Sequence, residues 1–273
     1  GGPGAGCTPG HRRFFDPAHY RSVLLDQRGA GRSRPTGGLE GNNTQAIIDD
    51  IELLRRRLEI EQWIVFGGSW GSTLGLAYAQ AHPERCRALV LRVVFLARQR
   101  EITWFMEGME NFFPVEYRQF VDYLPQDLRG DVLQGYIRLM NDPDPAVHLP
   151  AAQSWAKFEA ACATLLPNPD MVNELNDPVT ALGLGRLEAH FFANGMFLEE
   201  GQLLKNADRL SGIPGVIVQG RYDVICPPTS TQALADAWPD AELVYVSDAG
   251  HSATEPGITI ELVRAMERLK TLG

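Results

Sequence analysis

The strongest constraint in this sequence is a glycine-rich motif, Gly-Gly-Ser-Trp-Gly at residues 67–71, which matches the pattern G-x-S-x-G. It follows the apolar run 63–66, which is typical of a strand, and precedes residues 73–80, which favour a helix. A strained turn between strand and helix lifts a serine hydroxyl above a sheet, and the glycines remove side chains that would clash. A glycine-rich turn without chemistry is the alternative, but this position favours Ser69 as a nucleophile.

Strand and helix patterns alternate around this motif. The apolar run 22–26 ends in a glycine-rich loop and is typical of a buried parallel strand. From Asn43 or Thr44 as the capping residue, apolar side chains recur at steps of three and four and predict a helix that packs on a sheet. With a further strand at 88–92, the order predicts an α/β fold with a parallel, doubly wound sheet.

The middle of the chain has a different pattern. Between about residues 97 and 210 it consists of aromatic-rich helical segments interrupted by prolines, with little strand signal. We interpret residues 98–210 as a helical cap domain inserted into an α/β core formed by residues 1–97 and 211–273. The predicted elements after the cap are strands at 216–220 and 243–246 and helices at 231–238 and 258–269.

Composition excludes several classes of partner. The chain has 273 residues, 44% of them hydrophobic, and a net charge of -9, which argues against binding to nucleic acid or an anionic membrane. No apolar run approaches the length of a membrane span. The oligomeric state stays open. The cysteines stand far apart and are expected to be reduced thiols in a cytoplasmic protein; they are Cys7, Cys86, Cys162 and Cys226.

A serine nucleophile needs a base and a carboxylate that orients the base. Asp223 follows the strand predicted at 216–219 and His251 the strand at 243–246, so both lie at carboxyl ends of strands and in the order expected after the nucleophile. Asp248 is a rival acid, but its place in a turn better suits a loop-shaping role, and we retain Asp223. The other histidines do not follow a late strand; they are His11, His19, His82, His148 and His190.

The tetrahedral intermediate of acyl transfer needs backbone N–H donors that point at its oxyanion. The N–H of Trp70, directly after the nucleophile, is one candidate. The glycine-rich run at residues 1–6 offers a second, and Gly2 is the best placed. A flexible terminus is the alternative interpretation of this run.

Taken together, five segments resemble the proline iminopeptidases, a family of α/β-hydrolases. Residues 1–4 are similar to the tail of that family's His-Gly-Gly-Pro-Gly oxyanion loop. The other matching segments are 26–33, 67–72, 220–223 and 250–252. The resemblance implies an α/β-hydrolase fold and release of N-terminal proline from small peptides, with no metal and no cofactor.

The resemblance also implies a substrate site. Glu159 and Glu188 match the family positions that bind the substrate's amino group, which they would do through charge-assisted hydrogen bonds. Phe95, Trp104 and Phe105 are candidates for a pocket around the proline ring. Solvated helix residues are the alternative for the two glutamates, and core packing is the alternative for each aromatic residue.

One further feature is a cysteine near the site, and two others are departures from the family pattern. Cys226 resembles a family cysteine and is expected to lie near the triad without taking part in catalysis. Val93 stands where the family has glycine, so the pocket wall after Arg92 is expected to differ. The family normally begins with additional strands and a histidine before the first glycine, so N-terminal strands are expected to be missing.

The sequence therefore predicts acyl transfer, in which Ser69 attacks the prolyl carbonyl with His251 as base. One alternative keeps the triad but hydrolyses esters or other acyl donors, because fold and triad do not choose the acyl group. Another is a non-catalytic binding protein or a truncated chain. Dinucleotide binding is disfavoured, because no strand leads into G-x-G-x-x-G.

Overall fold

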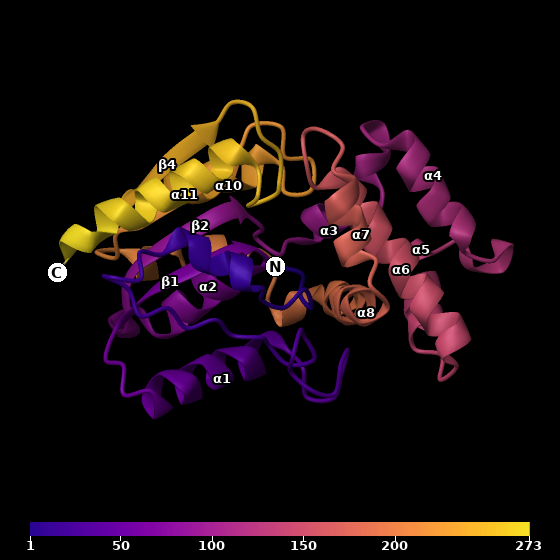
Figure 1. Ribbon diagram of the computed structural model, residues 1–273, viewed down its shortest axis with the longest axis horizontal. Helices are drawn as coiled ribbons and strands as arrows, with labels where there is room; N and C mark the ends of the chain where they lie inside the picture. Colours follow the sequence, from indigo (N-terminus) through magenta and orange to yellow (C-terminus); the bar gives the residue numbers. More distant parts are fainter. Residues whose placement is uncertain (273) are drawn as a thin grey trace.

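The core of the protein is a four-stranded parallel sheet with the strands in the order β1-β2-β3-β4. This computed structural model describes residues 1–272. The strands are β1 (Trp63–Ser69), β2 (Cys86–Val94), β3 (Gly215–Gly220) and β4 (Ala241–Val246). The predicted parallel sheet is confirmed, and all four strands run with their carboxyl ends toward the same edge (Figure 1).

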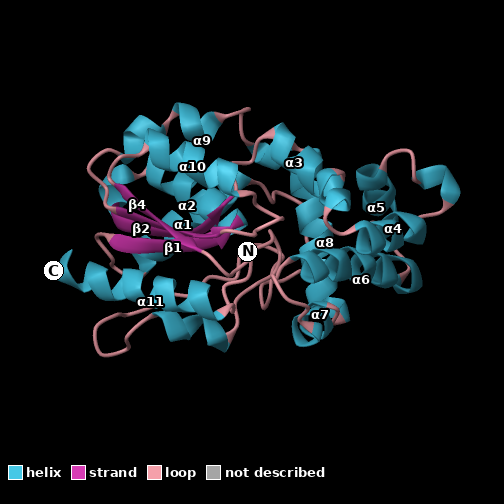
Figure 2. Cartoon of the chain, turned by 90° about the horizontal axis from the view of Figure 1, so that it is seen from above, coloured by secondary structure: helices cyan, strands magenta, loops and turns pink. Residues whose placement is uncertain are grey.

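Helices cover both faces of the sheet, because side chains alternate along its buried strands. Leu89 and Leu91 face the helices of one layer, whereas Ala88 and Val90 face the opposite layer. The first layer holds α1 (Thr44–Arg57), α2 (Trp70–Ala81) and α10 (Pro228–Ala237), and the second holds α11 (Pro256–Leu269) (Figure 2). Asn43 caps α1 by accepting a hydrogen bond from the Ala46 N–H at 2.9 Å, which decides between the two predicted caps.

The strand predicted at residues 22–26 is wrong. This segment belongs to no strand, and within residues 1–272 no strand pairs with it. An apolar run becomes a strand only when a neighbouring backbone completes its ladder of hydrogen bonds. Here β1 is an edge strand that pairs with β2 alone.

Residues 98–210, for which we keep the name cap, are helical in the structure. The helices are α3 (Gln99–Met106), α4 (Pro114–Tyr123), α5 (Val132–Met140), α6 (Pro145–Cys162), α7 (Pro169–Leu175), α8 (Pro178–Ala193) and α9 (Gln202–Lys205). Short 3-10 helices lie at Pro9–Phe14, Pro83–Arg85, Gly108–Asn111, Gln126–Leu128, Gly195–Phe197, Ala207–Leu210 and Lys270–Leu272. The division of the chain into core and cap domains stays a prediction.

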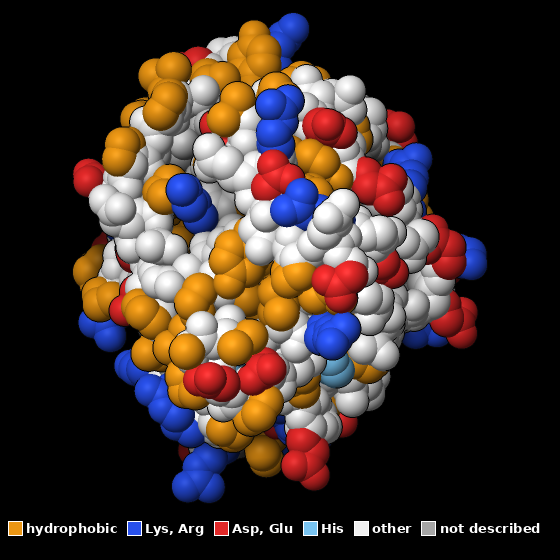
Figure 3. Space-filling view, turned by 90° about the vertical axis from the view of Figure 1, so that its right-hand side faces the viewer, with side chains coloured by type: hydrophobic (Ala, Val, Ile, Leu, Met, Phe, Trp, Pro, Cys, Tyr) orange, Lys and Arg blue, Asp and Glu red, His pale blue; other side chains and the backbone are white. Residues whose placement is uncertain are grey.

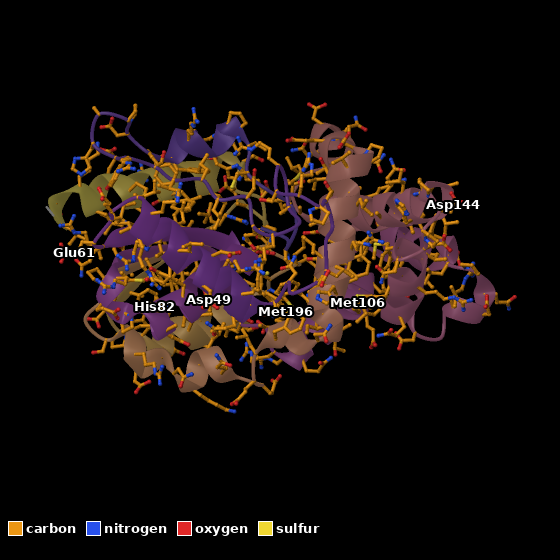
Figure 4. All side chains as sticks on the ribbon, turned by 90° about the horizontal axis from the view of Figure 1, so that it is seen from below. Asp49, Glu61, His82, Met106, Asp144 and Met196 are labelled. Carbon is orange, nitrogen blue, oxygen red and sulfur yellow. The ribbon has the colours of Figure 1, made fainter. Side chains whose placement is uncertain are left out.

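The cap helices α4 to α8 lie beyond the carboxyl edge of the sheet. In Figure 4, Glu61, which precedes β1, marks the end away from the cap, whereas Met106 and Met196 lie near the junction. Asp144, at the start of α6, marks the far end of the cap (Figure 4). Residues on the loops after the strands therefore face the cap.

A cluster of aromatic rings forms the interior of the cap. Phe120 stacks on Tyr136 and on Phe158, with ring centroids 4.4 Å and 4.6 Å apart. Trp155 meets Phe120 edge to face at 5.5 Å and is fully buried. Such pairs add to the free energy of burying the rings, so the cluster holds α4, α5 and α6 together.

The outer surface of the cap mixes apolar and charged side chains (Figure 3). The exposed large apolar residues of the cap are Phe112, Val115, Tyr123, Leu165, Leu166, Val179 and Phe197. Within residues 1–272, no helix combines the length and the apolar character needed to cross a membrane.

Val93, singled out in the sequence, is the extra residue of a β-bulge. Gly68 pairs with Arg92 and Ser69 with Val94, so Val93 is skipped in the ladder. Its φ is 46°, in the region that favours glycine and strains a β-branched side chain. The glycine expected from the resemblance fits this backbone better than the valine present.

We therefore expect Val93→Gly to destabilise the protein less than Val94→Gly. Val93 and Val94 are both fully buried in one core cluster, so both variants lose a similar apolar side chain. Only Val93→Gly also relieves strain, and it should destabilise by about 1–2 kcal/mol less than Val94→Gly. Urea unfolding measures the two losses, and equal losses would contradict the account.

Candidate active site

Ser69 stands at the junction of β1 and α2 in a strained backbone. Its φ and ψ are 57° and -125°, a conformation rarely adopted by a residue with a side chain. Gly67 permits the turn, because a Cβ at that position would lie 2.1 Å from the Gly71 carbonyl oxygen. The predicted strand, sharp turn and helix around Ser69 are thus present.

Ser72 ties this turn to the end of β2. Its hydroxyl donates to the Ser69 carbonyl oxygen at 2.6 Å and accepts from the Phe95 N–H at 3.0 Å. The Phe95 carbonyl oxygen accepts from the Thr73 hydroxyl at 2.6 Å. Phe95 is thereby fixed beside the serine turn, and its ring lies 6.3 Å from that of Phe192 on α8.

Asp223 and His251 are brought together at the carboxyl edge of the sheet. His251 Nδ1 lies 3.0 Å and 3.1 Å from the two carboxylate oxygens of Asp223, and both residues are buried. A carboxylate only accepts, so Nδ1 carries the proton and Nε2 is left as an acceptor. Asp248, the rival acid, lies exposed at the surface.

The serine hydroxyl is not yet engaged with the histidine. Among the hydrogen bonds of residues 1–272, none joins Ser69 to His251, and Ser69 Oγ instead lies 4.0 Å from Cys226 Sγ. The Cys226 N–H donates to Asp223 Oδ1 at 2.9 Å, so the serine faces the turn that carries the acid. Burial, and after it the Asp223 charge, raise the pKa of the Cys226 thiol well above its ordinary value, which leaves a neutral thiol.

The glycine-rich run at the start of the sequence lies between the serine turn and α8. A Cβ built on Gly71 would lie 3.9 Å from the Gly1 nitrogen, and one built on Gly4 only 2.2 Å from the Gly183 carbonyl oxygen. Backbone therefore approaches backbone closely at Gly4, where φ is 110°. Gly2 lies within this run, directly after Gly1, and its role as an oxyanion donor stays a prediction.

Trp70 joins the serine turn to both neighbours. Its N–H is one of the first donors of α2, and its side chain is fully buried. The indole Nε1–H donates to Gln27 Oε1 at 2.8 Å, and the ring meets Phe191 of α8 at 5.0 Å. The serine turn is thus packed directly against the cap.

The two predicted amine-binding carboxyls come from adjacent cap helices. Glu188 of α8 is buried, and its Oε2 accepts from the Trp155 indole N–H at 2.6 Å. Glu159 lies four residues after Trp155 on α6, on the same helix face. Within the described part of the chain, Glu159 Oε2 is buried without a hydrogen-bond partner.

These two carboxyls share an unfavourable environment. Burial raises the pKa of Glu159 above its ordinary value. Burial, and after it the neighbouring charge of Glu159, raise the pKa of Glu188 well above its ordinary value. This environment therefore favours the protonated, neutral form of a carboxyl in the pair, whereas a bound cation would favour the charged form.

The carboxyl pair and the histidine belong to one region. The Ala163 carbonyl oxygen, four residues beyond Glu159, accepts from the N–H groups of His251 at 3.1 Å and Ser252 at 2.8 Å. The end of α6 is therefore bonded to the turn that carries the histidine.

Trp104 and Phe105 occupy two different positions on α3. The Trp104 indole N–H donates to the Val224 carbonyl oxygen at 2.6 Å, directly after Asp223 in the chain. Phe105 is buried and meets Trp155 at 5.9 Å and Phe192 at 5.2 Å. Trp104 thus anchors the acid turn, and Phe105 supports the tryptophan that holds Glu188.

No sequence pattern indicated a role for Arg92 or Trp155. Arg92 is a half-buried cation whose guanidinium donates to the His251 carbonyl oxygen, and desolvation lowers its pKa. An arginine inside the apolar run of β2 was a signal of such a contact. Trp155 carried only the general signal of an aromatic residue near Glu159.

The carboxyl pair predicts a dependence of stability on pH. The folded state holds a proton on Glu188 that the unfolded state releases above the ordinary value of 4.5. Wild-type stability therefore falls, relative to Glu188→Gln, as pH rises through the raised pKa, by up to about 1.4 kcal/mol per pH unit. In thermal unfolding, the stability of Glu188→Gln relative to the wild type should be higher at about pH 8 than at about pH 5.

Glu174→Gln, a change at an exposed cap residue, is the matched control and should show no such trend. A stability difference between Glu188→Gln and the wild type that does not change with pH would contradict the assignment of the raised pKa.

Comparison with known sequences identifies the family of this chain. The profile of the alpha/beta hydrolase fold family matches residues 12–257. A proline iminopeptidase of Arabidopsis thaliana is 49% identical over 275 residues, which cover 100% of this chain and 72% of the relative. Proline iminopeptidases of Xylella fastidiosa and Neisseria meningitidis are 48% and 44% identical; the matches cover 94% and 98% of this chain and 82% and 86% of the relatives.

Solved structures share the fold at low sequence identity. An esterase from Rhodococcus matches with a TM-score of 0.61 and 15% identity, covering 93% of this chain and 82% of its own. An alpha/beta fold family hydrolase from Bacillus anthracis matches with a TM-score of 0.59 and 17% identity, covering 96% and 83%. Fold and sequence together show that the chain belongs to the proline iminopeptidase family of α/β hydrolases.

Proposed function

We propose that this chain is a serine aminopeptidase that releases proline from the amino end of small peptides. The observation that carries the proposal is the pair of Glu188, which is buried, and Glu159, whose Oε2 is buried without a partner in the described structure. The pair lies near the His251–Asp223 pair and the strained serine turn. The name shared by the relatives supports the same substrate.

The chemistry of the substrate fits this pair. An N-terminal proline presents a protonated secondary amine with two N–H groups, and two carboxylates can each accept one of them. Binding of the cation offsets the burial that raises the pKa of both carboxyls. A residue placed before the proline would remove the charge, so the pair also sets the exopeptidase register.

The proposed mechanism is acyl transfer through a covalent ester. His251 Nε2 takes the proton of the Ser69 hydroxyl as Ser69 Oγ attacks the prolyl carbonyl carbon, and Asp223 stabilises the imidazolium. The Trp70 and Gly2 N–H groups hold the oxyanion. His251 then donates the proton to the leaving amine, and water, activated by the same histidine, hydrolyses the ester and releases proline. No step requires a metal or cofactor.

The lack of a hydrogen bond between Ser69 and His251 in the described structure is compatible with this mechanism. Catalytic hydrogen bonds are often long without substrate and tighten when it binds. Asp223 already holds the imidazole, and the mechanism requires the Ser69 hydroxyl to turn from Cys226 toward His251.

We also propose a cytoplasmic location. The four cysteines of the described chain are all free thiols, and three of them are buried. Reduced thiols of this kind are typical of a reducing compartment.

Ser69→Ala should abolish labelling by a fluorophosphonate probe and lower kcat for proline para-nitroanilide by about 10⁴-fold or more. Cys226→Ala is the matched control, because Cys226 lies beside Ser69, and it should keep the label. Labelling that persists in Ser69→Ala would show that another residue is the nucleophile.

Glu159→Gln and Glu188→Gln should each lower kcat/KM for proline para-nitroanilide by about a hundredfold, because each removes a charged hydrogen bond to the amine. Hydrolysis of para-nitrophenyl acetate, which has no amine, should stay within about threefold of wild type. Equal losses on both substrates would favour a general structural role, and no loss on either would support the esterase alternative. The exposed Glu174→Gln again serves as control.

A further inference from the structure

Glu255 occupies the N-cap position of α11 but does not cap it. Side chains at this position usually accept hydrogen bonds from the first N–H groups of their own helix, and Glu255 makes no such bond. Its Oε1 instead accepts from the Gly250 N–H at 2.8 Å, and its Oε2 accepts from the Leu165 N–H at 3.1 Å. The carboxylate therefore bridges two turns that lie far apart in the sequence.

The same two turns are joined by further bonds. Ala163, just after α6, accepts from the N–H groups of His251 and Ser252. Two direct hydrogen bonds and the bridge through the Glu255 carboxylate therefore connect the histidine turn to the segment that follows α6. Because Glu255 accepts through a carboxylate, the hydrogen bonds from Gly250 and Leu165 are charge-assisted, whereas those to the Ala163 carbonyl are not.

The contact is tightly packed and leaves His251 little freedom. A Cβ built on Gly250 would lie 3.1 Å from the Leu165 nitrogen. On the opposite side, the Arg92 guanidinium donates to the His251 carbonyl oxygen. The backbone N–H of the histidine is thus held from the cap and its carbonyl from the core.

We propose that Glu255 is a positioning residue that holds the His251 turn against the end of α6, and so places the base relative to the amine-binding Glu159. The link is short, because Glu159 lies one helical turn before Ala163. Among the hydrogen bonds of residues 1–272, the Glu255 side chain makes none to Ser69 or Asp223, so we assign its effect to the backbone beside the histidine. The part that concerns Glu159 rests on the proposed function.

Removing the carboxylate should misplace the base rather than weaken substrate binding. Glu255→Ala should lower kcat for proline para-nitroanilide by about tenfold or more, because small displacements of a reacting group are costly. KM should stay within about threefold, since Glu159 and Glu188 are intact. Glu255→Gln keeps the size of the side chain but puts an NH₂ opposite one N–H donor. Its kcat should therefore lie between those of the wild type and Glu255→Ala.

Two further measurements separate positioning from stability. Glu267→Ala removes a half-exposed carboxylate from the same helix, with 52% of its side chain accessible, and should leave kcat unchanged. The proton NMR signal of His251 Nδ1–H should shift or broaden in Glu255→Ala and not in Glu267→Ala. If Glu255→Ala does not fold, Glu255→Gln carries the test through the same kinetic and NMR readouts.

Hydrolysis of para-nitrophenyl acetate keeps this inference separate from the proposed function. A kcat loss on the ester in the Glu255 variants supports the positioning role even if proline is not the substrate. Unchanged kcat on both substrates in a folded variant, or a loss confined to KM or thermal stability, would overturn it.

Discussion

Two carboxyl groups buried next to each other are unfavourable, and the cap is organised around holding them. Burial raises the pKa of both Glu159 and Glu188. In the described structure the Glu188 carboxyl accepts a hydrogen bond from the Trp155 indole N–H. That tryptophan is fixed by the aromatic rings packed around it, including Phe105 and Phe120. The stability of the aromatic cluster thus offsets a local arrangement that by itself opposes folding and favours binding of a cation.

The carboxyl pair is useful only if it is correctly placed relative to the sheet. Three contacts supply this placement. Trp70 packs on Phe191 of α8, Trp104 of α3 bonds to the acid turn, and Ala163 after α6 bonds to the histidine turn. Each connects a cap helix to a different loop at the carboxyl edge, so the position of the cap and the geometry of the reacting groups are fixed together.

Sequence alone predicted the parts of the site that depend on local pattern and chain order. Ser69 was found from its motif between strand and helix, and Asp223 and His251 from their places after late strands. Long-range pairing could not be predicted in this way. The apolar run 22–26 has the composition of a strand but no partner strand in the described structure, and Glu255 looks like an ordinary helix cap until its two distant donors are seen.

The central claim is that the substrate's positive charge is recognised by a buried carboxyl pair that places the carbonyl over Ser69. The most direct test compares wild-type kcat/KM for proline para-nitroanilide with that for cyclopentanecarboxylic para-nitroanilide, which has the same ring and leaving group but no amine. The account predicts that the neutral compound is cleaved at least about a hundredfold less efficiently. Cleavage of the two compounds at similar efficiency would contradict it.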